Sequence, residues 1–206
     1  MAEERGTTAI VRCAIPDGDP LFLRYHDEEW GRPVADDDRL YEKVSLEAFQ
    51  SGLSWRTILH KREALRRAFD GFAIDAVADF DAHRVQRLMA DATIVRNRRK
   101  IEAVIHNAKR AQALRTEFGS LGHFFWRFEP PASERPARVT AQWLRDHPIT
   151  PASTRLADAL KARDWRFVGP TTAYALMQAL GMVNDHVQGC AFRDPVSESR
   201  AAFVRP

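Results

Sequence analysis

Phe167-Val168-Gly169-Pro170-Thr171-Thr172-Ala173 stands between two segments of helical pattern near the C-terminus. Before it, apolar residues recur at helical spacing from Leu156 to Leu160, and after it we expect a helix from about Thr171 to Gly181. Gly169 lets backbone amides approach a ligand closely, and the free N–H groups at Thr171 and Thr172 attract an anion. Such a helix–hairpin–helix can hold a DNA phosphate without reading a base, whereas a Gly-Pro pair alone is usually a plain turn. The sequence leaves both interpretations open.

The rest of the chain also consists mainly of helical patterns. The segments with this pattern begin and end at about Asp36 and Gly52, Trp55 and Gly71, Asp81 and Met89, Ile101 and Gly119, and Leu121 and Phe128. Residues 129–151 contain five prolines, which exclude a long helix and predict an ordered connector. Ser153 or Thr154 is the expected cap of the helix that follows. Because no convincing strand pattern appears, we predict an all-α fold.

Composition limits the class of protein. The chain has 206 residues, of which 45% are apolar, and this suffices for one sizeable domain or two small lobes. No apolar run is long enough for a membrane span, and no secretory signal is visible at the N-terminus. The two cysteines do not make a disulfide framework, so we expect a cytoplasmic protein. A net charge of +3 permits nucleic-acid binding. The basic cluster Arg96–Lys100 fits either a solvated helix face or a phosphate-facing patch.

Both cysteines are paired with a histidine at opposite ends of the chain. Cys13 precedes His26, and His186 precedes Cys190 in an H-x3-C motif. Two nitrogens and two sulfurs form a complete tetrahedral ligand set for Zn²⁺, and such a closed shell leaves no open position for catalysis. The H-x3-C spacing predicts two ligands one helical turn apart on one face. The alternative is two buried thiols and two unrelated histidines.

Six motifs together carry a resemblance to a known family. They are Tyr25-His26-Asp27-Glu28-Glu29-Trp30-Gly31, Leu46-Glu47, Gly52-Leu53-Ser54-Trp55, Lys100-Ile101, Phe167-Val168-Gly169 and Val183-Asn184-Asp185-His186. In order and spacing, over roughly residues 11–192, they resemble DNA-3-methyladenine glycosylase I. The resemblance implies a base-excision repair enzyme of the helix–hairpin–helix superfamily. Such an enzyme flips 3-methyladenine out of duplex DNA and hydrolyses its N-glycosidic bond.

The resemblance also implies an architecture of one glycosylase unit, residues 1–206, with two lobes. Residues from about 1 to 35 and from 184 to 206 would form a lobe joined by zinc. Residues 36–183 would form the helical lobe, with the helix–hairpin–helix near 155–182. We expect a monomer that binds duplex DNA containing alkylated adenine, releases free 3-methyladenine and has no membrane partner.

The family's site residues carry over by position. The structural zinc would be bound by Cys13, His26, His186 and Cys190, and the base pocket would contain Phe22, Tyr25, Trp30, Glu47 and Trp55. Phe22 stands where a tyrosine is common, and Thr93 replaces a common glycine. Thr171 occupies the position of the lysine nucleophile of bifunctional superfamily members. Asn184 occupies the position of the usual catalytic aspartate, with Asp185 beside it. These two positions imply a monofunctional glycosylase.

The residue types suit this chemistry. Glu47 has apolar neighbours, so it needs a donor, which a cationic purine can supply, although a glutamate is more often solvated. Trp30 and Trp55 are either core residues or stacking partners for a positively charged base. Leu53, after Gly52, is either a core residue or the wedge that fills the gap left by a flipped nucleotide. Water would be the nucleophile and Glu47 the catalytic and base-reading carboxylate.

Rival functions remain open. A broader alkylpurine glycosylase would use the same site for other lesions, and a non-catalytic zinc-stapled module would bind DNA without regard to damage. A zinc hydrolase is disfavoured by the closed ligand shell. The sequence contains neither a dinucleotide-binding glycine motif nor a P-loop, so we expect no nucleotide or redox cofactor.

Overall fold

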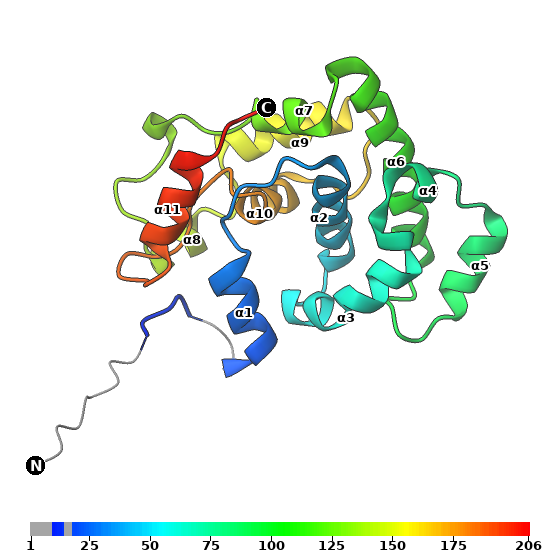
Figure 1. Cartoon of the computed structure of the whole chain (residues 1–206), viewed down its shortest axis with the longest axis horizontal. Helices are drawn as coiled ribbons and strands as arrows, with labels where there is room; N and C mark the ends of the chain where they lie inside the picture. Colours follow the sequence, from blue (N-terminus) through cyan, green and yellow to red (C-terminus); the bar gives the residue numbers. More distant parts are fainter. Residues whose placement is uncertain (1–9, 15–17) are drawn as a thin grey trace, which may run out of the picture.

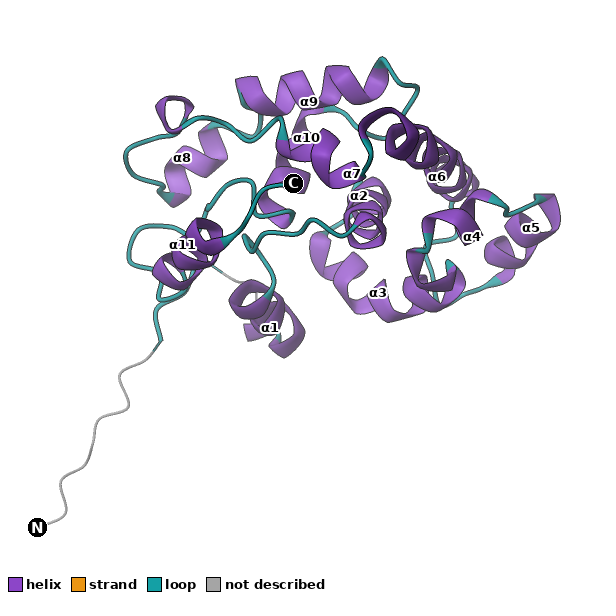
Figure 2. Cartoon of the chain, turned by 45° about the horizontal axis from the view of Figure 1, so that its top comes forward, coloured by secondary structure: helices purple, strands orange, loops and turns teal. Residues whose placement is uncertain are grey.

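A computed structural model describes residues 10–14 and 18–206 of the chain. Its helices are α1 (Pro20–Glu28), α2 (Asp37–Gln50), α3 (Trp55–Ala68), α4 (Ile74–Ala78), α5 (Ala82–Ala90), α6 (Arg98–Phe118), α7 (Leu121–Trp126), α8 (Ala141–Asp146), α9 (Pro151–Lys161), α10 (Pro170–Ala179) and α11 (Arg193–Ala202), with short 3-10 turns η2 (Asp70–Phe72) and η3 (Ala132–Glu134). The described residues contain no strand (Figure 2). The predicted all-α class is therefore confirmed. No helix among them combines the length and apolar character that a membrane span requires.

Helix α2 lies at the centre of the helical assembly, between α3, α6 and α10 (Figure 1). Its residues from Leu40 to Phe49 are all buried, so the helix is covered on every side. Tyr41 illustrates this packing, because its hydroxyl donates to the carbonyl of Val104 on α6 at 2.8 Å. As a consequence, the charged residues of α2 are also enclosed, among them Glu47. This burial sets the electrostatics of the pocket described below.

Some helix ends differ from the sequence prediction. Helix α9 starts at Pro151, and its cap is Thr150 rather than Ser153 or Thr154. Proline suits the first helical position, and Ser153 completes a capping box by accepting from the backbone N–H of Thr150 at 2.9 Å. Four helices have no counterpart in the sequence analysis, namely α1, α4, α8 and α11. Except for α11 they are short, and packing against neighbours rather than a long periodic pattern holds such helices.

The two ends of the chain meet beside the end of α10. The backbone N–H of Gly31 donates to the carbonyl of Gln178 at 3.1 Å, and that of Val34 to Leu180 at 3.2 Å. Gly181 has φ of +73°, and a Cβ there would lie 2.4 Å from the backbone of Arg32. Only glycine permits this approach. The contact brings the segment after α1 against α10, and so places the N-terminal aromatic residues beside the helix–hairpin–helix.

Candidate active site and metal centre

The structure brings Cys13, His26, His186 and Cys190 together in one cluster. Their ligand atoms all lie within 4.8 Å of one another, and every residue except Cys13 is fully buried. The Sγ of Cys190 lies 3.4 Å from Nδ1 of His186 and 3.7 Å from Nε2 of His26, and the Sγ of Cys13 lies 3.9 Å from Nδ1 of His186. These four residues could hold a metal ion between the two ends of the chain.

The nitrogen of each histidine that faces away from the cluster has its own acceptor. His26 Nδ1 lies 2.8 Å from the carboxylate of Asp27, which Arg12 anchors in turn at 2.8 Å. His186 Nε2 lies 3.1 Å from the carbonyl of Trp30. Because these acceptors require an N–H, the lone pairs of His26 Nε2 and His186 Nδ1 point into the cluster, which is the arrangement typical of metal-bound histidines.

In the absence of a metal, burial shifts the pKa of one cysteine and of one histidine of the cluster in opposite directions. It raises the pKa of the Cys13 thiol to about 11, although the N–H of Val187, 3.3 Å from the sulfur, favours the thiolate. It lowers the pKa of His186 to about 4, so this imidazole is neutral at physiological pH. A neutral imidazole is ready to bind a metal, whereas the thiol must first lose its proton.

The H-x3-C motif does not form the predicted helical turn. Residues 184–190 are irregular, with a turn at Gln188 and Gly189, and Gly189 has φ of +87°. The backbone N–H of Cys190 donates to the carbonyl of Val187 at 3.0 Å. A left-handed glycine reverses the chain here, so the two ligands converge through a tight turn rather than along a helix face.

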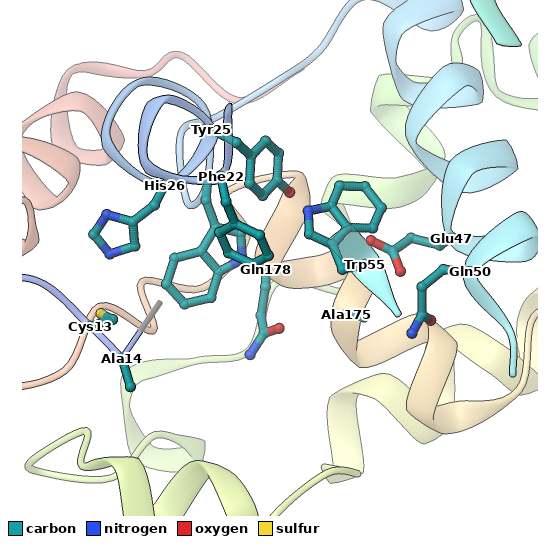
Figure 3. Close-up of a pocket in the computed structure, with 11 residues that line it drawn as sticks. Cys13, Ala14, Phe22, Tyr25, His26, Glu47, Gln50, Trp55, Ala175 and Gln178 are labelled. Atoms are coloured by element: carbon teal, nitrogen blue, oxygen red, sulfur yellow. The ribbon is translucent and has the colours of Figure 1, made fainter. Parts of the chain in front are cut away.

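A pocket of about 290 Å³ opens next to this cluster. It is large enough for about one purine base by the usual scale of small-ligand sites. Residues from α1, α2, α3 and α10 surround it (Figure 3). The lining residues are Cys13, Ala14, Phe22, Tyr25, His26, Trp30, Glu47, Gln50, Trp55, Ala175 and Gln178. All five residues that the sequence assigned to the base pocket are therefore neighbours in space.

Aromatic rings form the walls of the pocket. The rings of Tyr25 and Trp55 lie 5.2 Å apart, and those of Phe22 and Tyr25 lie 6.4 Å apart edge to face. Trp30 has a second function, because its ring lies 4.8 Å from that of His186 and 6.0 Å from that of His26. The cysteine and histidine cluster thus supports one wall of the pocket through Trp30.

Glu47 is the carboxylate of this pocket. It projects from α2 towards the ring of Trp55 (Figure 3), and only 5% of it is exposed. This burial makes the solvated alternative for Glu47 wrong. Within the described part of the chain its carboxylate has no hydrogen bond or ion pair. Burial raises the pKa of Glu47 to about 8, and the charge of Lys43 opposes that rise. The indole N–H of Trp55 is also buried and has no partner among the described residues.

Four pocket residues were missed by the sequence analysis, namely Ala14, Gln50, Ala175 and Gln178. Gln50 follows Glu47 by one turn of α2, and its amide donates to the carbonyl of Leu53 at 2.9 Å. Gln178 donates its amide N–H to the carboxylate of Asp185 at 2.7 Å. Glutamine gives little local signal, and helical periodicity alone did not indicate which faces of α2 and α10 meet the pocket.

Asp185 is occupied by structural contacts. Its side chain is fully buried and accepts from Tyr174 at 2.7 Å, from Gln178 and from Arg135. The neighbouring Asn184 donates its amide to Ser197 at 2.9 Å and to the carbonyl of Arg193 at 2.8 Å. Neither side chain is among those that line the pocket. The site therefore has no free aspartate in this segment.

The residues assigned to DNA lie outside the pocket lining. Leu53 is 37% exposed at the turn between α2 and α3, where Gly52 has φ of +76°. Thr171 and Thr172 lie in the first turn of α10, and no side chain caps that helix. Gly169, however, has φ of −64°, so its backbone does not require glycine, and a Cβ there would meet no atom within 4 Å. Glycine at this position would instead leave the backbone open to approach by a group from outside the chain.

The basic side chains of residues 96–100 do not share one environment, because one is buried and the others are exposed. Lys100 turns inward and donates to the carbonyls of Phe49 at 2.7 Å and Ser51 at 2.5 Å, at the C-terminal end of α2. Arg96 and Arg99 stay exposed. Arg99 lines a shallow depression with Arg166 and Phe167, beside the helix–hairpin–helix turn. The start of α6 is thus next to both the Leu53 turn and the hairpin.

Comparisons with known proteins decide the family. The methyladenine glycosylase family model matches residues 15–194. The chain belongs to this family. It is 43% identical over 182 residues to the DNA-3-methyladenine glycosylase 1 of Escherichia coli, a match that covers 88% of this chain and 96% of the relative.

Solved structures agree with this assignment. A crystal structure of 3-methyladenine DNA glycosylase I has a TM-score of 0.80 at 40% identity, covering 88% of this chain and 98% of that one. The Staphylococcus aureus 3-methyladenine DNA glycosylase I, whose structure addresses 3-methyladenine recognition, has a TM-score of 0.78 at 32% identity, covering 88% and 96%. The resemblance seen in the sequence motifs and the fold expected for this methyladenine glycosylase are therefore confirmed.

Proposed function

We propose that this chain removes 3-methyladenine from alkylated duplex DNA in the pocket between α1, α2, α3 and α10, with Glu47 as the carboxylate that recognises the base. Membership of the family makes the chain a hydrolase of N-glycosyl bonds that acts in base-excision repair. The observation that carries the proposal for the site is the buried, unpaired carboxylate of Glu47 in an aromatic pocket. The S. aureus relative, which recognises 3-methyladenine, supports the choice of ligand.

The pocket suits a cation better than a neutral purine. A methylated adenine in DNA carries positive charge, which an indole face attracts and a buried carboxylate stabilises strongly. Its amino group can donate to Glu47, which otherwise has no donor. Normal adenine lacks both the methyl group and the positive charge, so the electrostatic attraction of the pocket favours the lesion.

The charge on the base also explains how the site works without a free aspartate. A positively charged purine is a good leaving group, so the bond needs less general acid and base assistance. Asp185 is held by Arg135, Tyr174 and Gln178, and Thr171 supplies no amine for a Schiff base. Water would therefore be the nucleophile, and Glu47 would also stabilise the oxocarbenium-like sugar. The product would be an abasic site in an uncut strand.

The DNA would lie across two turns that flank the start of α6. One is the turn between α2 and α3 that carries Leu53, and the other is the hairpin between α9 and α10. Lys100 holds the end of α2 next to Leu53, and Asn107 on α6 holds the hairpin through two bonds with the backbone of Arg166, of 2.9 and 3.0 Å. Leu53 would fill the gap left by the flipped nucleotide. The free N–H groups at Thr171 and Thr172, with Gly169 before them, would bind a phosphate.

Zinc is the metal that best fits the cluster. A tetrahedral shell with zinc–sulfur and zinc–nitrogen bonds of ordinary length has edges of about 3.3 to 3.8 Å. Three of the six separations between the ligand atoms are 3.4, 3.7 and 3.9 Å, and all six lie within 4.8 Å. With four protein ligands this zinc would be structural. It would hold Trp30 in the pocket wall and join the terminal lobe, residues 1–35 and 184–206, to the helical lobe. We further expect a monomer that works in the cytoplasm, where its DNA substrate lies.

Chromatography of the bases released from methylated duplex DNA tests the proposed function. We expect 3-methyladenine as the released base and an intact strand before alkali treatment. Release of 7-methylguanine at a comparable rate would favour the broader alkylpurine glycosylase. Binding that ignores the lesion, with no base released, would instead indicate a DNA-binding module without catalysis.

A further inference from the structure

The wall behind Glu47 contains a concentration of buried charge. A second, small cavity, here called the rear cavity, shares Tyr25, Glu47 and Trp55 with the base pocket and is lined mainly by residues of α1, α2 and α3. Its charged or titratable side chains are Tyr25, Glu29, Arg39, Glu42, Lys43, Glu47, Arg62 and Arg66. Ala179 of α10, which completes the lining, contributes no charge. These are the groups that face Glu47 from the elements packed around it.

Most of these charges are already paired. Glu29 accepts from Arg62 through both oxygens, at 2.7 and 2.8 Å. Glu42 accepts from Arg39 at 2.5 Å and from Arg66 at 2.7 Å. Each arginine in this wall therefore has a carboxylate in direct contact, and each of these two carboxylates has at least one arginine.

Lys43 and Glu47 are the two charged groups left over. Within the described residues, neither side chain has a hydrogen bond or a close ion pair. Lys43 is 8% exposed and Glu47 is 5% exposed, so water solvates each charge only in part. They lie one turn apart on α2, a spacing that puts two side chains on the same helix face. The charge of Lys43 favours the ionised form of Glu47, whereas the carboxylates that favour charged Lys43 are Glu29 and Glu42.

We propose that Lys43 is a positioning residue that acts as the buried counter-charge of Glu47 and keeps this carboxylate available to a cationic base. The inference rests on the proposed function of the pocket. Geometry also separates the lysine from the ligand, because Glu47 lines both the base pocket and the rear cavity, whereas Lys43 lines only the rear cavity. The carboxylate thus stands between the lysine and the base.

The direction of the effect of Lys43 on the pKa of Glu47 agrees with this proposal. Burial raises the pKa of Glu47 and lowers the pKa of Lys43, each to about 8, while the attraction between Lys43 and Glu47 opposes the rise. Glu29 and Glu42 favour the charged form of Lys43, whereas Arg39 and Arg62 disfavour it. Without Lys43, Glu47 would hold its proton to a higher pH and could not accept from the base as an anion. A cationic base has the opposite effect, since it favours the carboxylate and releases the proton.

An NMR titration tests this without any substrate. Protein labelled with ¹³C at the glutamate side chains gives the pKa of Glu47, whose signal is assigned by its loss in Glu47→Gln. In Lys43→Met the pKa of Glu47 should rise by about one unit or more, from two charges one helical turn apart. Lys43→Arg should stay near the wild-type value, and so should Lys109→Met, which removes an exposed lysine from α6. An equal Glu47 pKa in wild type and Lys43→Met would overturn the proposal.

The wild-type protein provides a second measurement in case Lys43→Met does not fold. The ¹⁵N signal of the Lys43 ammonium should change at the pH at which Glu47 ionises, in addition to its own titration. A lysine signal that ignores the ionisation of Glu47 would contradict the pairing.

The pH profile of base release connects the pair to function. The rising limb of kcat/KM reports the free enzyme, so in Lys43→Met it should move upward by about one pH unit, giving about tenfold less activity on its acid side. The two profiles should converge above the raised Glu47 pKa of the variant, where Glu47 is ionised in both proteins. A uniform loss at every pH would indicate a merely structural role. A wild-type protein that releases no base would overturn the proposed function, whereas an unshifted Glu47 would overturn only the role of Lys43.

Discussion

His26 Nε2 lies 3.7 Å from the Sγ of Cys190, although 164 positions separate the two residues in the chain. The contact closes the N-terminal segment onto the C-terminal one next to the base pocket. Trp30, which lines that pocket, packs its ring on both histidines of the cluster. Loss of the metal should therefore affect both stability and the pocket wall.

Cys190→Ser should lose the metal and destabilise the protein. The binding energy of a structural metal is folding energy, and a site saturated about a hundredfold above its Kd contributes about 3 kcal/mol. Elemental analysis and thermal unfolding, each with and without a chelator, measure both effects. The control is Ala191→Ser, an exposed neighbour. Wild-type protein that contains no zinc and keeps full stability and activity in chelator would refute the structural site.

Glu47→Gln should weaken binding of 3-methyladenine about ten- to hundredfold, because one hydrogen bond to a charged group contributes about 1.5 to 3 kcal/mol. Trp55→Leu should weaken it separately through lost stacking. Tryptophan fluorescence during titration with the free base measures affinity in the first variant, and calorimetry measures it in the second. Unchanged affinity in folded Glu47→Gln would remove Glu47 from the site.

Glu47→Gln should also make the protein more stable, increasingly so at higher pH. An unfolded glutamate ionises near pH 4.3, whereas the pKa of about 8 in the native state keeps the proton on Glu47. Between these values the unfolded state binds fewer protons, so the stability of the wild type falls as pH rises, and it levels off above pH 8. Chemical denaturation across this range should show the gap widening. Glu117→Gln, on the surface of α6, should show no such gain, and parallel curves for Glu47→Gln and wild type would contradict the raised pKa.

Gly169→Asp should weaken binding to damaged and undamaged duplex alike. A carboxylate beside a phosphate costs about 1 to 2 kcal/mol, or about five- to thirtyfold in affinity. Gly169→Ala is the matched control, because the backbone there tolerates a side chain and a Cβ meets nothing within 4 Å. Fluorescence anisotropy with both duplexes measures the change. If binding to the lesion alone suffers, the hairpin is not the phosphate site.

The enzyme should produce abasic sites without cutting the strand, because Thr171 has no amine for a covalent intermediate. Borohydride added during turnover on lesion DNA should trap no protein–DNA adduct. A bifunctional glycosylase under the same conditions is the positive control. A trapped adduct in this chain would show that another amine acts as nucleophile.

The sequence by itself determined the features that have a local signal. Apolar periodicity predicted α2, α3, α5, α6, α7, α9 and α10, and the residue types of the cysteine and histidine pairs predicted a metal site. The pattern around Glu47 left a solvated helix residue as the more common alternative, and only the structure shows that this carboxylate is buried. Family motifs assigned five aromatic and acidic residues to one pocket, and the structure places all five around it.

Tertiary structure alone decided which distant residues meet and with what charge. The turn at Gly189, the place of Gln178 in the pocket and the capture of Asp185 by Arg135, 50 positions away, leave no periodic trace in the sequence. Lys43 likewise has no signal in the sequence that distinguishes it from an ordinary solvated helix residue. Its burial follows from the packing of other elements on every side of α2. Burial and pairing arise from packing between elements, and the free energy of a charge depends on that surrounding rather than on its neighbours in the chain.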